Sequence, residues 1–255
     1  MIEIVRYPLV VFVLSFLGMW LSAWVGLTLR ERKLKLDEGL HRDLDLIVSA
    51  TLTLLGLIIG FSFSMAISRY DQRKSYEEAE ANAIGTEYVR ADLLPAADAA
   101  KVRALLKSYL NERILFYVTR DGAELQQINA KTSQLQAGLW SAVQSPAMAQ
   151  PNPLSALALS GMNDVLNSQG YTQAAWWNRI PPGAWWLMAA VAICANLLIG
   201  YDSRLAGQRA VRLLILPFIL CIAFFAIADI DSPRRGVIRV NPQNLESLAQ
   251  SLQGQ

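Results

Sequence analysis

Four long apolar blocks, none of which contains a charged residue, constrain the fold of this chain more than any other feature. They cover residues 7–29, 46–68, 180–201 and 213–228. A helix needs roughly 20 apolar residues to cross the hydrocarbon core of a bilayer, and three blocks meet that length. The fourth is shorter, so its span is expected to use flanking residues, over about 211–230. Because lipid forces backbone hydrogen bonds to close within each segment, the sequence predicts an all-α membrane protein with four transmembrane helices. The alternative is a soluble protein in which these helices are buried.

The first block is expected to be a retained span rather than a cleaved signal peptide. Its 23 residues exceed the apolar core of a signal peptide, which is about 7–15 residues long. No cleavage site of small residues stands before the charged stretch that begins at Arg30.

The polar residues exclude several classes of function. Lys and Arg number 23 against 21 Asp and Glu, a net charge of +2, which excludes a strongly basic protein that binds nucleic acid. One histidine, His41, and two cysteines, Cys194 and Cys221, leave too little material for a zinc cluster or a Ser–His–Asp triad. We therefore expect no enzyme activity, no metal and no cofactor.

The segment between the second and third blocks is too long for a loop without structure of its own. Residues 70–94 contain one Gly and no Pro, so the second span is expected to continue out of the membrane as a helix. Apolar residues then recur at helical spacing over 102–117, a face more typical of a packed core than of a docking surface. The expected domains are 1–68 (first span pair), 69–179 (helical domain), 180–230 (second span pair) and 231–255 (tail).

Two overlapping rows mark the second span. Small residues fall within about 80° on a helical wheel, a pattern that lets helices pack closely; they are Ser49, Thr53, Gly56, Gly60 and Ser64. Beside them, Thr53, Leu57 and Phe61 stand at i, i+4 and i+8. Contributed by several copies, that row makes stacked rings, polar at Thr53 and apolar at Leu57 and Phe61, and apolar rings can gate a pore by dewetting. The two interpretations are compatible, since one edge can pack while its neighbour faces a lumen.

Charged residues near the span ends have a functional and a structural interpretation. Arg69 and Arg73 follow the second span as either a charged vestibule or an ordinary solvated boundary. Asp229 and Asp231 follow the fourth span, where a helix-terminal or Arg-paired structural role is favoured over a cation site.

Glu77, Glu78 and Glu80 are expected on a solvated helix face. The positive-inside rule does not orient the chain, because eight Lys and Arg flank the spans on either side.

Three stretches carry a family resemblance. The first is residues 56–70, with Gly60-Phe61 and then Arg69-Tyr70; the second is residues 80–95 followed by 102–113. The third, residues 231–248, begins with a turn that contains Asp231, Pro233 and Gly236. Together these stretches resemble the bestrophin-like domain family of mostly bacterial membrane proteins, and more distantly the bestrophin ion channels.

The resemblance implies a multi-pass protein of the cell (inner) membrane with both termini, the helical domain and the tail in the cytoplasm. It also implies a homo-pentamer in the lipid bilayer, with a pore lined by the second span and a neck at Thr53, Leu57 and Phe61. The resemblance does not fix the sign of the permeant ion, because bestrophin-type channels differ in ion selectivity; Arg69 and Arg73 favour an anion such as chloride. Calcium-activated bestrophins have an acidic run after the last span. This chain has Arg234, Arg235 and Arg239 there, so calcium gating is not expected. The alternative function is a non-conducting membrane scaffold or sensor whose helical domain binds a protein partner.

Overall fold

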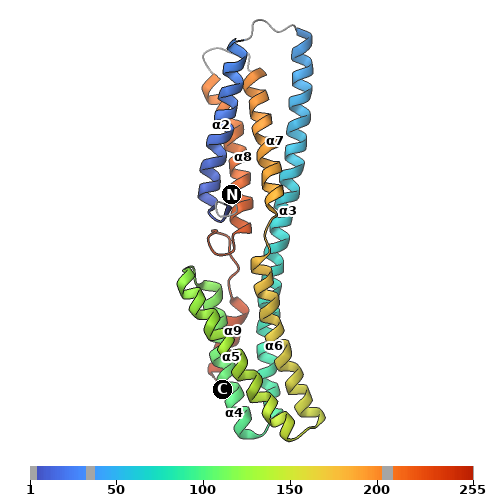
Figure 1. The fold of residues 1–255 in the computed structure, drawn as a ribbon, viewed down its shortest axis with the longest axis vertical. Helices are drawn as coiled ribbons and strands as arrows, with labels where there is room; N and C mark the ends of the chain where they lie inside the picture. Colours follow the sequence, from blue (N-terminus) through green and yellow to red (C-terminus); the bar gives the residue numbers. More distant parts are fainter. Residues whose placement is uncertain (1–4, 33–37, 203–208, 255) are drawn as a thin grey trace. The chain divides into compact units, whose positions relative to one another are not determined.

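The structure is a computed structural model that describes residues 5–32, 38–202 and 209–254, with side chains described for 5–30, 43–202 and 214–254. The described residues form helices and turns, with no strand. In chain order they are α2 (Pro8–Arg32), α3 (Glu38–Arg90), the 3₁₀ turn η1 (Ala91–Leu93), α4 (Ala96–Val118), α5 (Gly122–Ala149), α6 (Pro153–Trp177), α7 (Pro182–Asp202), α8 (Arg209–Asp231) and α9 (Gln243–Gln253) (Figure 1). The side chain of His41 lies outside the described residues.

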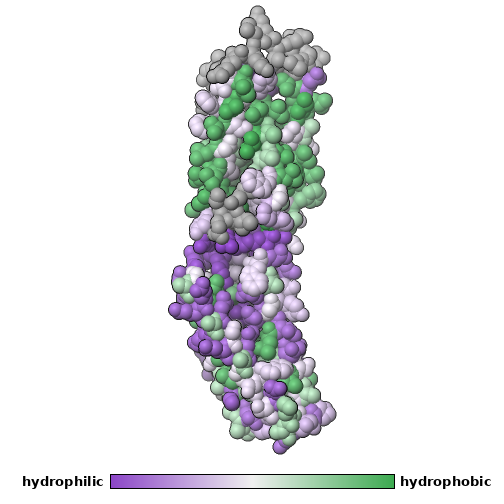
Figure 2. Space-filling model, in the orientation of Figure 1, coloured by the Kyte–Doolittle hydropathy of each residue, from purple (hydrophilic) through white to green (hydrophobic). Residues whose placement is uncertain are grey.

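Four helical segments among the described residues are long and apolar enough to cross a membrane. They cover the four apolar blocks of the sequence except for positions 7 and 213, so the predicted all-α fold with four membrane helices is confirmed. In Figure 2, hydrophobic residues cover most of the face around α2, α7 and α8, where the apolar blocks lie. The short fourth block lies inside α8, which adds charged residues at both ends.

The chain divides into two compact units. The membrane unit comprises residues 1–68 and 179–238, and the second unit comprises residues 69–178 and 239–255. The expected tail, 231–255, is therefore shared between them: its first part belongs to the membrane unit, and α9 belongs to the second.

In the membrane unit, α2 packs against both α7 and α8. Two glycines bring α2 and α7 into backbone contact: a Cβ at Gly26 would overlap the carbonyl oxygen of Leu197, and one at Gly200 would overlap that of Ala23. Ser22 adds a hydrogen bond from its hydroxyl to the carbonyl of Ile193, at 2.7 Å. Small residues that let backbones approach are the usual device of helix packing in lipid.

In the second unit, α4, α5 and α6 pack in sequence, and α9 packs on α4. The apolar face over residues 102–117 is part of the core, as expected: Val102, Leu106, Tyr109 and Phe116 are all fully buried. The rings of Phe116, Tyr117 and Trp176 meet edge to face, with centroids 5.0–5.5 Å apart. This face is therefore not a docking surface.

Two prolines lie at or near helix ends in the second unit. The helix α4 begins at Ala96, with Pro95 at the N-cap and Asp98 in the first turn. Pro146 lies inside α5, which ends at Ala149. Since it falls in the last turn, its missing N–H removes a single helical hydrogen bond.

Candidate functional site

The membrane part of α3 has one buried face and one exposed face. Leu55, Ser62 and Ala66 are 1%, 5% and 0% exposed, and their spacing of seven and four residues puts them within about 40° on a helical wheel. On the other side, Leu57 and Phe61 are 54% and 66% exposed, and Thr53 is exposed as well. The row of Thr53, Leu57 and Phe61 therefore lies on the face of α3 that is not covered by other helices of the same chain.

The small residues beside this row are also open within one chain. Nothing among the described residues lies within 4 Å of a Cβ built at Gly56 or Gly60, and Ser64 is exposed. The close helix contact inside the chain is made by Gly26 and Gly200 instead. A packing role for Gly56, Gly60 and Ser64 stays a prediction about contact with another copy.

The hydroxyl of Thr53 is already engaged. Its Oγ1 donates a hydrogen bond to the carbonyl of Ser49, at 2.9 Å. The hydroxyl hydrogen is therefore used within the helix, and the exposed face of this row offers no side-chain donor to an anion.

Beyond the apolar block, α3 continues as the same helix into the second unit, where its core-facing seam is unusually charged. Residues at alternating spacings of four and three are buried along it, each at most 1% exposed: Arg73, Glu77, Glu80, Ile84, Glu87 and Ala91. Three of the four charged side chains on this buried face, Arg73, Glu77 and Glu80, form hydrogen bonds to other helices of the second unit. The expectation of a solvated face is thus wrong for Glu77 and Glu80, and right for the exposed Glu78.

Arg73 holds the end of α6. Its Nε donates to the carbonyl of Ala175 and its Nη2 to that of Asn178, both at 3.2 Å. A cation at the C-terminal carbonyls of a helix complements the helix dipole. Arg73 is 1% exposed, so the structure gives it an environment different from the open vestibule expected; Arg69 is half-buried.

Glu77 holds the start of α9. Its Oε1 accepts hydrogen bonds from the backbone N–H groups of Asn244 and Leu245, at 2.9 and 3.0 Å, and its Oε2 accepts one from the Asn244 side chain at 2.6 Å. The N-cap position of α9 is Pro242, which makes no side-chain cap. The Glu77 carboxylate, which comes from α3, therefore accepts the N-terminal hydrogen bonds of α9 that an N-cap side chain would otherwise accept.

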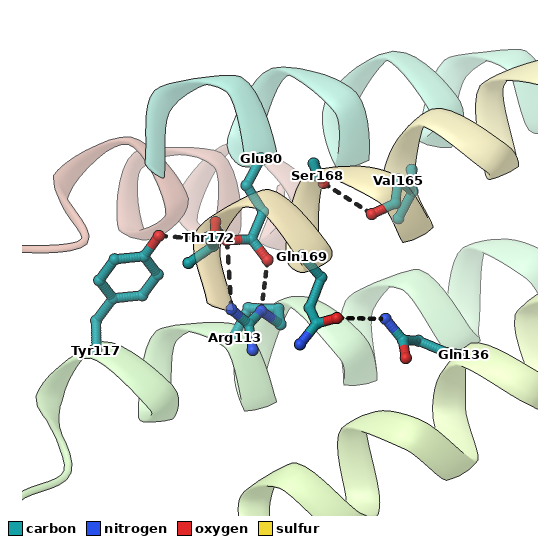
Figure 3. A network of polar contacts seen from close by, with 8 residues as sticks. All are labelled: Glu80, Arg113, Tyr117, Gln136, Val165, Ser168, Gln169 and Thr172. Carbon is teal, nitrogen blue, oxygen red and sulfur yellow. Dashed lines mark hydrogen bonds and ion pairs between the residues drawn. The ribbon is translucent and has the colours of Figure 1, made fainter. Parts of the chain in front are cut away.

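Glu80 is the centre of a buried polar network (Figure 3). It pairs with Arg113 through two contacts: Nε to Oε1, and Nη2 to Oε2 at 3.4 Å. The hydroxyls of Tyr117 and Thr172 donate to the same Oε2, at 3.3 and 3.1 Å. The network thereby joins α3, α4 and α6.

The network also controls ionisation. Burial raises the pKa of Tyr117, and the negative charge of Glu80 raises it further. Burial by itself lowers the pKa of Arg113, but the Glu80 carboxylate outweighs it and the pKa is raised. Both groups therefore keep their protons in the folded state.

Glu87 is the exception on the seam. It is 0% exposed, and neither carboxylate oxygen accepts a hydrogen bond from any residue that the structure describes. Burial raises its pKa from 4.5 to about 8, against the opposing effect of Arg90. Sequence reasoning missed the seam, although charged residues in register with Ile84 and Ala91 were a signal for it.

The turn after α8 is built on the two aspartates of the fourth span. Asp229 accepts hydrogen bonds from the N–H groups of Val237 and Ile238, at 2.7 and 2.8 Å. Asp231 accepts from the N–H of Ile180, at 3.2 Å, and so ties the turn to the start of the third span. Gly236 is required, because a Cβ there would overlap the carbonyl oxygen of Asp229.

These contacts favour the helix-terminal role of the two aspartates. Pro233 is buried in the same turn. The described residues hold no group of three or more potential metal ligands.

The model of the Bestrophin-like domain matches residues 9–245. The chain belongs to the bestrophin-like family. The match covers the exposed row of α3, the charged seam and the turn after α8, and it confirms the resemblance carried by the three sequence stretches.

Solved structures share the fold of this bestrophin-like chain. A variant of a bacterial bestrophin homologue from Klebsiella pneumoniae has 12% sequence identity and a TM-score of 0.64, over 96% of this chain and 97% of that one. A structure of the homologue obtained by Zn-SAD phasing has 13% identity and a TM-score of 0.62, over 95% and 94% of the two chains. At this identity the likeness shows the fold alone. No curated protein matches the chain.

Proposed function

We propose that several copies of this chain assemble into an ion channel whose pore is lined by the exposed face of α3. The observation that carries the proposal is the placement of Thr53, Leu57 and Phe61 on the face of a membrane helix that its own chain leaves uncovered. Membership of the bestrophin-like family supports the same assignment. The assembly is a pentamer of the cell (inner) membrane with both termini in the cytoplasm, as the family resemblance implies.

The neck consists of three rings spaced one helical turn apart, or about 5–6 Å. Leucine and phenylalanine rings exclude water from a narrow pore and so control conduction without a charged gate. The Thr53 hydroxyl donates to its own helix. The neck therefore sets no preference between anions and cations, and an anion such as chloride is the candidate that the reversal potential tests.

Planar-bilayer recording of the purified oligomer under a salt gradient tests the channel. We expect a current in the wild type, and a larger current or altered gating in Leu57→Ala and Phe61→Ala. Phe63→Ala is the matched control, because Phe63 is an exposed phenylalanine of the same helix that lies about 160° around the wheel from Phe61. The sign of the reversal potential then decides between chloride and a cation.

Three results would overturn the proposal. A purified protein that is monomeric cannot enclose a lumen with one copy of α3. An equal response to Phe63→Ala and Phe61→Ala would mean that the exposed row is not the lining. Silence of a verified oligomer, in both the wild type and Phe61→Ala, would favour the scaffold or sensor function.

A further inference from the structure

Glu87 differs from the other charged residues of the α3 seam in its surroundings. Arg73, Glu77 and Glu80 each bind groups of another element, whereas both carboxyl oxygens of Glu87 are buried without a hydrogen bond among the described residues. An ionised carboxylate in that position is unfavourable if it stays unpaired, and such groups take up a proton instead.

The neighbour of Glu87 across the helix contact is Gly161 of α6. A Cβ at Gly161 would overlap Oε2 of Glu87 and would lie 2.5 Å from Nη1 of Arg90. The absence of a side chain at Gly161 therefore leaves the space that the ends of the Glu87 and Arg90 side chains occupy. The Glu87 carboxyl thus lies directly against the backbone of α6.

Two charged groups act on Glu87. Arg90 stands one turn further along α3, and Asp164 comes from α6; they lie 3.9 Å apart, with side chains 29% and 64% exposed. Arg90 is thus shared between two carboxyl groups, of which Asp164 is the solvated one. The arrangement leaves the net charge neutral when Asp164 is ionised and Glu87 is not.

We propose that Glu87 is a proton-binding site whose occupancy controls the packing of α6 on α3. With the proton bound, the neutral carboxyl is tolerated beneath Gly161. When the O–H bond breaks, the proton passes to a base in solution and the negative charge stays on Glu87. That charge attracts Arg90 away from Asp164 and draws water to the carboxyl, which loosens α6 around Gly161.

Infrared difference spectroscopy of the full-length protein tests the first half of this proposal. As the pH rises from about 6 to about 10, the wild type is expected to lose a protonated-carboxyl band with a midpoint near 8. Glu87→Gln is expected to lack that band and still fold, because Gln matches the neutral acid in shape. Glu78→Gln, which changes an exposed carboxyl of the same helix, should keep it.

Backbone hydrogen exchange tests the second half. Exchange of the α6 amides around Gly161, corrected for the intrinsic effect of pH, should rise several-fold through the same pH range in the wild type and in Glu78→Gln. It should stay flat in Glu87→Gln. Absence of a Glu87-dependent band would show that the site does not hold a proton. A band without the change in exchange would show that the proton does not control the packing. Either result overturns the proposal, and neither depends on whether the protein conducts ions.

Discussion

The Arg113 guanidinium and the Glu80 carboxylate form an ion pair in which both side chains are 0% exposed. The tyrosine and threonine hydroxyls around it use the remaining capacity of the carboxylate. A pair of this kind is costly to break, because the surviving partner is left as a buried charge. It joins two helices whose paired residues are 33 positions apart in the sequence.

Glu80→Gln is therefore expected to destabilise the second unit by about 3–5 kcal/mol, because Arg113 is left without a counter-charge. The measurement is the free energy of unfolding in detergent. The double variant Glu80→Gln/Arg113→Met should recover much of the loss, because no buried charge remains. Glu78→Gln is the control, and a loss of equal size there would contradict this role of the pair.

The Glu77 carboxylate is expected to hold α9 in place. Glu77→Ala removes the acceptor for two backbone N–H groups at the start of α9, which costs about 0.5–2 kcal/mol for a lost cap. Hydrogen exchange of residues 243–253 should increase, with little change in α5. Unaltered protection of α9 would mean that its buried leucines, Leu245 and Leu252, hold it alone.

The Asp229 carboxylate is expected to maintain the turn after α8. Asp229→Ala removes the charged acceptor of the N–H groups of Val237 and Ile238, at a cost of about 1.5–3 kcal/mol for hydrogen bonds to a charged group. Trypsin should then cut faster at Arg235 and Arg239. Asp71→Ala, at an exposed position, should leave the cutting rate unchanged, and the idea fails if both variants behave alike.

The α2–α7 contact is expected to tolerate no side chain at Gly26. Gly26→Ala places a methyl group against the carbonyl of Leu197 and forces the helices apart, at about 1–3 kcal/mol. Gly18→Ala is the matched control in the same helix, because nothing among the described residues lies within 4 Å of its Cβ. Thermal unfolding in detergent should separate the two variants, and equal midpoints would refute the close contact.

The stability of the second unit is expected to fall as the pH rises from 4.5 to about 8. Folding raises the pKa of Glu87, so the folded state binds more protons than the unfolded state in this interval, and stability decreases with pH wherever that holds. Below the interval both states are protonated, and above it both are ionised. The difference in unfolding free energy between wild type and Glu87→Gln should follow this course, whereas a difference that is constant with pH would contradict the raised pKa.

The sequence by itself determined the four membrane helices, because hydropathy over a 20-residue stretch is a local property. It also predicted that the second span continues beyond the membrane, since residues 70–94 have almost no helix breakers, and it identified the row at Thr53, Leu57 and Phe61. Only the tertiary structure decided which side chains of α3 are buried. The groups that bind Glu80 and Glu77 come from residues 113, 117, 172, 244 and 245, and no local pattern pairs residues so far apart. The burial of Glu87 could not be predicted for the same reason. Its carboxyl lies against Gly161 of another helix, and it accepts no hydrogen bond from the residues that the structure describes.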